Sequence, residues 1–475
     1  MSHRTTRAFW RVLLVVACAL TGCDDSTPPT AGSDRFPDLE ACSIPGISGA
    51  LCGSYTVFED REARTGRIIS IGLVVLPATA ANPEPDPVVF FAGGPGQAAT
   101  SLLLSYSLDY AELRDARDLV FIDQRGTGVS HPLMCAGPLP SGEASVLGTL
   151  FPPDHVDACR QHLSQGADLS LYATHQAVDD IADVLDGLGY EKVNLNGASF
   201  GTRTVQVFMR RHPEIVRTAV MNAVAPIDRN IYLHGAANVD SALDILFDEC
   251  ETDATCSVNY PDIRDRFWGL VSEFDGGPIQ VQLSVGTVAF GRGDFGYAVR
   301  GMLYGELADE IPAWTWESWL TDDFSRFAYY AIERSIWVAS ETFATGLHLS
   351  VLCTEDVAST TDQQVETLTA GTLLGPELID RYRAACSAWA AGTLPPGFHD
   401  PVSSAVPTLL ISGERDPATP PSWGEEVSAL LSNSRHIIVP MGGHGVYGPC
   451  TLQAERKLVE EGSVEGLITS CPAGG

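Results

Sequence analysis

Residues Val193–Thr202 read VNLNGASFGT: an apolar, strand-like run leads into Gly-x-Ser-x-Gly, and a helix-compatible segment follows. This order predicts a nucleophile elbow, a tight strand-to-helix turn that keeps a serine in strained backbone geometry. The glycines on either side of the serine relieve the crowding, because they carry no Cβ. Ser199 is therefore the predicted nucleophile, with its hydroxyl above the edge of a sheet.

A serine hydroxyl is a weak nucleophile and needs a base that takes its proton during the attack. His444, in Met441–Gly445 (MGGHG), is the predicted base, because imidazole titrates near neutral pH and can later protonate the leaving group. Asp416, in Leu410–Pro417 (LISGERDP), is predicted to accept a hydrogen bond from the other ring nitrogen and to fix its tautomer. The chain order Ser, Asp, His is that of α/β-hydrolases and differs from the orders of chymotrypsin and subtilisin.

The tetrahedral intermediate of such a reaction also needs an oxyanion hole. One donor is predicted to be the backbone N–H of Phe200, the residue after the nucleophile. The other is predicted to come from the loop Gly93–Gly96 (GGPG), where the lack of side chains lets the backbone approach the substrate oxygen. Gly94 is the favoured donor, and Gly93 is the alternative.

Apolar strand-like runs alternate with helix-compatible segments before residue 228 and return after residue 400, which predicts an α/β fold. The sheet is expected to be mostly parallel, with helices on both faces, because its strands are apolar throughout. Helix-like and aromatic runs dominate residues 228–400, so this stretch is predicted to be a mainly helical cap inserted into an α/β-hydrolase core. The predicted strands are 67–77, 88–92, 119–123, 216–224, 407–412 and 437–440, and the predicted helices are 175–188 and 202–211.

The N-terminus has the features of an export signal. Basic residues precede the apolar run Val12–Leu20, which is too short to span a bilayer. Leu20–Cys23 (LTGC) resembles a bacterial lipobox, so Cys23 is the predicted lipidation site that anchors an exported protein to a membrane of the cell envelope. An ordinary secretory signal is the alternative. The predicted organisation is a signal peptide at 1–22, a polar tether at 23–38, the first part of the core at 39–227, the cap at 228–400 and the second part of the core at 401–475.

Composition narrows the classes of partner. The formal net charge is −31, so nucleic acid is not expected as a partner, because phosphate contacts need a basic face. Of the twelve cysteines, those other than Cys18 and Cys23 are even in number, which predicts disulfides in an exported chain. Pairing between sequence neighbours is our prediction, although the sequence alone leaves the connectivity open. Neither a Cys-x2-Cys pair nor a His-Glu-x-x-His motif occurs, so no metal and no cofactor is predicted.

Taken together, these motifs resemble those of the serine peptidases of the proline iminopeptidase and tripeptidyl aminopeptidase group. The cysteine spacings and the segment Cys353–Glu355 are similar to those of its exported tripeptidyl aminopeptidase branch. The resemblance covers residues 40–471. The matching motifs are Ala92–Gly96 (AGGPG), Asp123–Ser130 (DQRGTGVS), Gly197–Gly201 (GASFG), Gly413–Pro420 (GERDPATP) and Gly443–Gly445 (GHG).

Two positions depart from the pattern of this group. Ala92 stands where the group has a histidine that helps to shape the oxyanion loop, and Phe200 stands where the elbow has a tyrosine. Neither change removes a triad residue or a backbone N–H donor. The departures therefore bear on substrate preference more than on activity.

The resemblance implies a serine exopeptidase that releases short peptides from free N-termini through an acyl-enzyme. Such an enzyme needs anions that bind the substrate ammonium group, and it rejects N-blocked substrates because they leave the carboxylates unpaired. Glu355 and Asp356 are the candidates for this contact, since they fall where the cap would return toward the core. Asp123 and Arg125 are expected to form a structural ion pair behind the site.

Two other functions stay open at this point. A carboxylesterase or lipase uses the same triad and would cleave acyl esters without any need for a free amine. A non-catalytic binding protein on a hydrolase scaffold is the third hypothesis, because a fold does not guarantee a function. The intact triad argues against the third hypothesis, and dependence on a free amine separates the first two.

Overall fold

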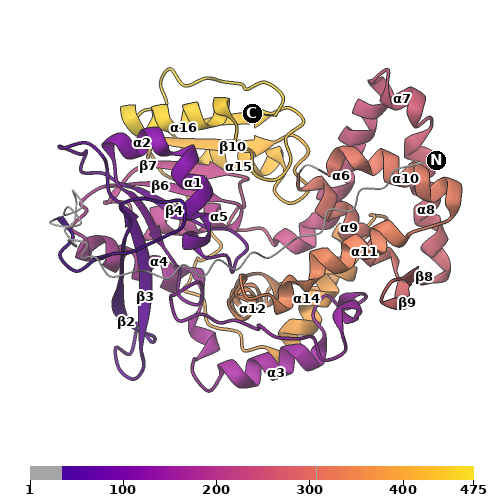
Figure 1. Ribbon diagram of the computed structural model, residues 1–475, viewed down its shortest axis with the longest axis horizontal. Helices are drawn as coiled ribbons and strands as arrows, with labels where there is room; N and C mark the ends of the chain where they lie inside the picture. The colour runs from indigo at the N-terminus through magenta and orange to yellow at the C-terminus, as the bar shows by residue number, and fades with distance from the viewer. Residues whose placement is uncertain (1–34, 306, 475) are drawn as a thin grey trace, which may run out of the picture.

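The computed structural model describes residues 35–305 and 307–474. Within these residues a nine-stranded sheet has the strand order β1-β2-β3-β5-β4-β6-β7-β10-β11 (Figure 1). The strands from β5 to β11 in this order run parallel, whereas β1, β2 and β3 are antiparallel to their neighbours. The strands are β1 (Glu40–Ala41), β2 (Leu51–Phe58), β3 (Ile68–Leu76), β4 (Val88–Phe91), β5 (Leu119–Ile122), β6 (Val193–Ala198), β7 (Val216–Asn222), β10 (Thr408–Gly413) and β11 (Ser434–Val439).

β4 and β5, in the interior of the sheet, are continuous apolar runs because both of their faces are covered. Every residue of β4 (VVFF) and of β5 (LVFI) is buried. In register, Val89 of β4 pairs with Val120 of β5 on one side and with Leu195 of β6 on the other. β2, near the antiparallel edge, mixes buried and exposed residues instead. This arrangement confirms the predicted α/β-hydrolase fold with a mostly parallel sheet.

Helices pack against both faces of the sheet. On one face, α1, α2 and α16 contribute buried residues such as Tyr106 and Val459. On the other face, α4, α5 and α15 contribute Ile181, Phe208 and Val427. The core helices are α1 (Leu103–Asp109), α2 (Ala111–Ala116), α4 (Thr174–Gly187), α5 (Phe200–Arg211), α15 (Pro421–Leu430) and α16 (Pro449–Glu461).

A second, mainly helical body lies beside the sheet, on the right in Figure 1, and is formed largely by the chain between β7 and β10. We refer to this body as the cap. Its helices are α6 (Ile231–Thr252), α7 (Cys256–Asn259), α8 (Ile263–Ser272), α9 (Arg292–Leu303), α10 (Ile311–Thr321), α11 (Ser325–Ser335), α12 (Thr345–Leu352), α13 (Asp362–Thr369) and α14 (Glu377–Ala388), with a π-helical turn at Cys353–Val357.

Two features of the cap were not predicted. β8 (Ile279–Leu283) and β9 (Gly286–Phe290) form an antiparallel hairpin, in which Val281 and Val288 are buried. In addition, α3 (Pro153–Leu163), which lies between β5 and β6 in the chain, packs against α12 and α14. Its buried Val156 and Leu163 belong to the apolar core of the cap. The cap therefore includes a segment that the sequence analysis placed in the hydrolase core.

Within residues 35–305 and 307–474, five disulfides connect cysteines that are neighbours in the sequence, as predicted. The Cys353–Cys386 bridge ties the π-helical turn to α14, and the Cys250–Cys256 bridge ties the end of α6 to α7. The other three are Cys42–Cys52, Cys135–Cys159 and Cys450–Cys471. The predicted lipidation site Cys23 and the predicted signal peptide lie outside the described residues.

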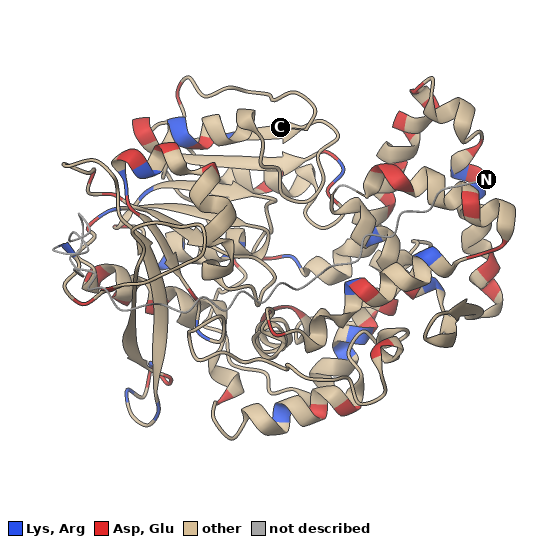
Figure 2. Cartoon of the chain, viewed as in Figure 1, with Lys and Arg blue, Asp and Glu red and all other residues tan. Residues whose placement is uncertain are grey.

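The surface of the described chain is acidic. Figure 2 shows Asp and Glu positions, in red, spread over the outer helices of both the core and the cap, in keeping with the net charge of −31. A helix with the length and apolar character of a membrane span does not occur in residues 35–305 or 307–474.

Candidate active site

The nucleophile elbow lies between β6 and α5. Ser199 has φ 56° and ψ −125°, a conformation that few residues other than glycine adopt. A Cβ on Gly197 would collide with the Gly201 carbonyl, and a Cβ on Gly201 would collide with the Phe91 carbonyl. These close approaches explain why the turn requires glycine on both sides of the serine.

The three predicted triad residues meet at the carboxyl ends of parallel strands. Ser199 follows β6, Asp416 follows β10 and His444 follows β11. The Ser199 hydroxyl lies 2.7 Å from His444 Nε2, and His444 Nδ1 lies 2.9 Å from Asp416 Oδ2. Burial alone would raise the pKa of Asp416, but the contact with His444 and hydrogen bonds from Thr419 outweigh it and lower this pKa. Asp416 therefore stays ionised and can orient the imidazole.

Thr419 is a component of this site that the sequence analysis did not assign. Its hydroxyl donates to Asp416 Oδ2 over 2.6 Å and lies 3.3 Å from His444 Nδ1. The backbone N–H groups of Ala418 and Thr419 both donate to Asp416 Oδ1. The sequence could have suggested this contact, because Thr419 lies three residues after Asp416 in the motif Gly413–Pro420. A threonine at that spacing can turn its hydroxyl back to the aspartate.

The glycine-rich loop Gly93–Gly96, which follows β4, lies against the elbow. A Cβ added to Gly93 would approach Ser199 Cβ to 3.1 Å. Among the residues that the structure describes, the N–H groups of Gly94 and Phe200 have no hydrogen-bond acceptor. Both groups are therefore free to bind a substrate oxygen, and their role as oxyanion donors stays a prediction.

A cap residue, Tyr304, contacts the loop that carries His444. Its carbonyl accepts the backbone N–H of His444 over 3.0 Å, and its ring centre lies 4.5 Å from the imidazole centre. Arg300 of α9 donates to the Tyr304 hydroxyl over 2.6 Å. The sequence offered no signal for this contact, because Tyr304 is remote from the triad along the chain.

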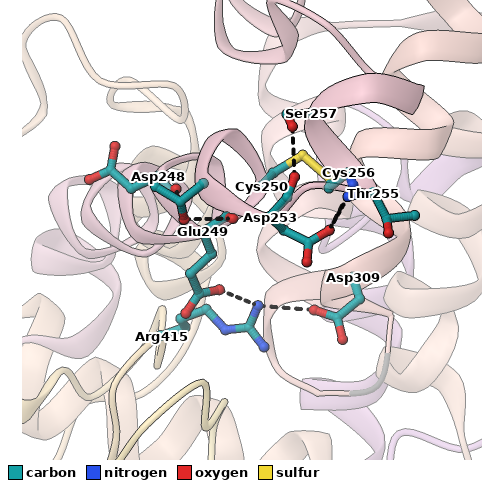
Figure 3. The surroundings of a disulfide bond; sticks show 10 residues. Asp248, Glu249, Cys250, Asp253, Thr255, Cys256, Ser257, Asp309 and Arg415 are labelled. Atoms are coloured by element: carbon teal, nitrogen blue, oxygen red, sulfur yellow. Dashed lines mark hydrogen bonds and ion pairs between the residues drawn. A yellow bond between two sulfur atoms is a disulfide. The ribbon is translucent and has the colours of Figure 1, made fainter.

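Arg415, the residue before Asp416, connects the core to the cap (Figure 3). Its Nη1 donates to Glu249 of α6 and to Asp309 of the cap, each over 3.0 Å. Its Nε and Nη2 donate to the Met441 carbonyl in the loop that carries His444. One side chain thus contacts the cap and links the two loops that hold the acid and the base.

Glu355 and Asp356 lie next to α5, the helix that follows Ser199, and both are close to Arg203 of that helix. Both are buried, and Arg203 of α5 donates to Asp356 Oδ1 over 2.8 Å while its Nη1 lies 3.8 Å from Glu355 Oε2. The Thr174 N–H donates to Glu355 Oε1 over 2.7 Å. Burial raises the pKa of Glu355 to about 7 and also raises that of Asp356. Their role as the contact for a substrate ammonium group stays a prediction.

The expected ion pair between Asp123 and Arg125 is wrong. Arg125 instead forms a bidentate pair with Asp180 of α4, with Nε–Oδ2 and Nη2–Oδ1 distances of 2.6 and 2.9 Å. Asp123 accepts from the backbone and hydroxyl of Thr100 and from the Val129 N–H. The prediction failed because it assumed that the side chains of two nearby residues in one loop face each other. The Arg125 guanidinium instead extends to Asp180 on α4.

Two family models match the chain. Residues 86–248 match the alpha/beta hydrolase fold family, and residues 373–471 match the TAP-like protein family. With the sheet and the side-chain geometry above, these matches show that the chain has the α/β-hydrolase fold. The relatives described next include a tripeptidyl aminopeptidase and a proline iminopeptidase, to which parts of the chain are similar.

Three curated relatives illustrate this similarity. Tripeptidyl aminopeptidase of Streptomyces coelicolor is 26% identical over 42% of this chain and 38% of its own length. Serine protease Hip1 of Mycobacterium tuberculosis is 24% identical over 52% of each chain. Proline iminopeptidase of Neisseria gonorrhoeae is 28% identical over 30% of this chain and 34% of its own. The chain thus spans about half or less of the length of these relatives.

Proposed function

We propose that this protein is a serine exopeptidase that releases short peptides, from single N-terminal residues to tripeptides, from substrates with free N-termini. The observation that carries the proposal is the continuous contact from the Ser199 hydroxyl to His444 Nε2, at 2.7 Å, and from His444 Nδ1 to Asp416 Oδ2, at 2.9 Å. The curated relatives named as aminopeptidase and iminopeptidase support a peptide as the substrate.

The proposed reaction proceeds through an acyl-enzyme. The Ser199 oxygen attacks the scissile carbonyl while His444 Nε2 takes its proton, and the N–H groups of Phe200 and Gly94 bind the resulting oxyanion. His444 then gives the proton to the leaving amine, so the C–N bond breaks and the acyl group remains on the serine. Water, deprotonated by His444, hydrolyses this ester and restores the Ser199 hydroxyl.

We assign the substrate ammonium group to Glu355 and Asp356 within this proposal. In the part of the chain that the structure describes, Glu355 Oε2 and Asp356 Oδ2 have no hydrogen-bond partner. Arg203 already pairs with Asp356 Oδ1 at 2.8 Å and lies 3.8 Å from Glu355 Oε2, so a substrate ammonium group would share these two carboxylates with Arg203.

We also propose that the protein is exported and attached to a membrane of the cell envelope through a lipid on Cys23. The LTGC motif at Leu20–Cys23 supports this proposal. The five disulfides support export, because such bonds persist in oxidising compartments. Metabolic labelling with a fatty-acid analogue tests it, since a Cys23→Ser variant is expected to lose the label and the membrane association.

The enzymatic proposal is tested with two chromogenic tripeptide anilides, one with a free N-terminus and one N-acetylated. We expect the wild type to cleave only the free peptide and Ser199→Ala to cleave neither. Glu355→Gln, which keeps the shape of the side chain, is expected to reduce the preference for the free peptide. Turnover of simple acyl esters that depends on Ser199, without cleavage of either peptide, would assign the protein to the carboxylesterases instead. Failure of a fluorophosphonate to label Ser199 would indicate a non-catalytic protein.

A further inference from the structure

The loop that is predicted to present the oxyanion donor is bonded to the cap. Residues 343–348, at the start of α12, run alongside the loop Gly93–Gly96, and we call them the support segment. The Ala344 N–H donates to the Gly96 carbonyl over 3.0 Å. His348 Nδ1 lies 2.7 Å from the Pro95 carbonyl oxygen. The cap therefore makes hydrogen bonds to two consecutive carbonyls of this loop.

The partners of His348 define its protonation. A carbonyl oxygen only accepts, so Nδ1 carries the hydrogen and donates it to Pro95. Nε2 is then an acceptor, and the Tyr382 hydroxyl of α14 donates to it over 3.1 Å. His348 is 1% exposed, and this burial lowers its pKa to about 4. The imidazole is therefore neutral at neutral pH, with one donor and one acceptor that are both matched.

The support segment also confines the loop sterically. The Phe343 ring lies against the loop, so that a Cβ on Gly94 would approach it to 3.2 Å and a Cβ on Gly96 to 2.9 Å. Gly93 of the same loop abuts Ser199, because a Cβ on Gly93 would approach Ser199 Cβ to 3.1 Å. The loop is thus enclosed between the elbow and an aromatic ring from the cap, which leaves its backbone little freedom to rotate.

The loop has no polar side chain of its own to fix its path. Residues Ala92–Gly96 are Ala, Gly, Gly, Pro and Gly, and none of these side chains forms hydrogen bonds. An oxyanion hole works only when its donors are already oriented before charge develops on the substrate oxygen. The orientation of this loop must therefore come from groups outside it, and His348 supplies the one side-chain hydrogen bond to its backbone in the described structure.

We propose that His348 is a positioning residue for the oxyanion hole, acting through its Nδ1–H bond to the Pro95 carbonyl. This bond orients the loop so that the Gly94 N–H faces the oxygen of the group attached to Ser199. A cap residue thereby controls the rate of attack by the core nucleophile. The inference rests on the proposed function only in that Ser199 must form a covalent adduct.

The test compares three variants by a readout that is independent of the natural substrate. This readout is the second-order rate constant for labelling of Ser199 by a fluorophosphonate, whose P=O oxygen occupies the oxyanion hole. His348→Phe keeps an aromatic ring among the neighbouring rings of Phe151 and Trp337 but removes the donor. His348→Asn places an amide N–H where Nδ1 stood. Ser350→Ala is the matched control, because Ser350 is a buried polar residue of α12 whose hydroxyl bonds Trp389 and not the loop.

We expect His348→Phe to label about 10- to 100-fold more slowly than the wild type, a smaller loss than deletion of an oxyanion donor causes. His348→Asn is expected to recover most of the rate, and Ser350→Ala to stay within about twofold of the wild type. With the tripeptide anilide, the loss in His348→Phe should fall on kcat while KM changes little, because the bond matters most in the transition state.

Three results would overturn the inference: a wild-type labelling rate in folded His348→Phe, equal losses in the Phe and Asn variants, or a change confined to KM. Circular dichroism and the thermal midpoint establish folding, and His348→Leu replaces the Phe variant if that does not fold. A wild type that labels but cleaves no peptide would contradict the proposed peptidase function and leave this comparison intact.

Discussion

Single residues in the active site occupy conformations that their neighbours enforce. Ser199 has φ 56° and ψ −125°, a backbone conformation that costs of order 1–3 kcal/mol. Its N–H donates to the Asn222 carbonyl, and the Thr202 hydroxyl donates to its carbonyl over 2.7 Å. These bonds hold the strained turn, and the turn directs the hydroxyl at His444. Replacement of the flanking glycines would disturb the turn because a Cβ has no room there.

Thr419→Val is expected to lower kcat/KM by about 10- to 100-fold, because a hydrogen bond to a buried carboxylate contributes about 1.5–3 kcal/mol. The variant leaves Asp416 Oδ2 without the Thr419 hydroxyl, so the acid orients His444 less well. Thr419→Ser, which keeps the hydroxyl, is the control and should retain most of the activity. Steady-state kinetics with the free tripeptide anilide provide the measurement, and wild-type activity in folded Thr419→Val would contradict the role.

At the scale of elements, β6 connects the nucleophile to a buried acid on α16. Asn196 of β6 donates to Glu455 Oε2 over 2.8 Å, and the Tyr110 hydroxyl donates to the same oxygen over 2.6 Å. Burial raises the pKa of Glu455 to about 7. The folded protein therefore retains a proton on this group at a pH where the unfolded chain has released it.

This pKa predicts that stability falls as pH rises. The carboxyl of Glu455 has a pKa near 4.5 when exposed and about 7 when folded. Between these values the folded state binds more protons than the unfolded state, so the free energy of unfolding decreases with increasing pH. Glu455→Gln, which is neutral and keeps the acceptor, should be more stable than the wild type at pH 8, by about 2 kcal/mol.

Chemical denaturation of both proteins at pH 5 and pH 8 measures this difference. At pH 5 the two should be similar, because Glu455 is protonated in the folded wild type. An equal difference between the two proteins at both pH values would show that Glu455 does not titrate as its burial indicates.

At the scale of the whole molecule, the cap and the core meet at the catalytic loops. Tyr304 of the cap accepts the His444 N–H, the support segment bonds the oxyanion loop, and Arg415 of the core bonds Glu249 and Asp309. Activity is therefore expected to depend on the docking of the cap as well as on the triad itself. Arg415 is the most direct test of this dependence, because its side chain contacts both bodies (Figure 3).

Arg415→Met is expected to lower kcat/KM about tenfold and to lower the thermal midpoint. The variant removes the donors to the Met441 carbonyl and leaves the cap carboxylates without their shared cation. Asp309→Asn is the control, since the Asp309 side chain is 70% exposed and an exposed ion pair contributes about 0–1 kcal/mol. Kinetics and thermal melts of both variants provide the measurement. Equal effects of the two substitutions would argue against a special role for Arg415.

Local patterns in the sequence predicted most strands of the sheet, although not β1 and β2, and the three side chains that meet at Ser199. β4 and β5 were predictable because a strand buried on both faces must be a continuous apolar run. The elbow was predictable because its strained turn admits glycine at Gly197 and Gly201 and little else. The disulfides match the prediction of pairing between sequence neighbours, although the sequence alone left their connectivity open.

Side-chain partners across long stretches of sequence could not be predicted in this way. Arg125 pairs with Asp180 rather than with its neighbour Asp123. The hairpin β8–β9 was also missed, because its alternation of buried and exposed residues is short and lies between helical segments.

The sequence by itself predicted the hydrolase fold and the three residues proposed as nucleophile, acid and base, because the apolar strands, the glycine-flanked serine and the chain order Ser, Asp, His are all readable in the sequence. Only the tertiary structure decided how the cap meets these groups. His348, Tyr304 and Arg415 act on loops that are distant along the chain. These contacts form only when the cap packs against the core. The spacing of residues along the sequence does not predict how the two parts pack.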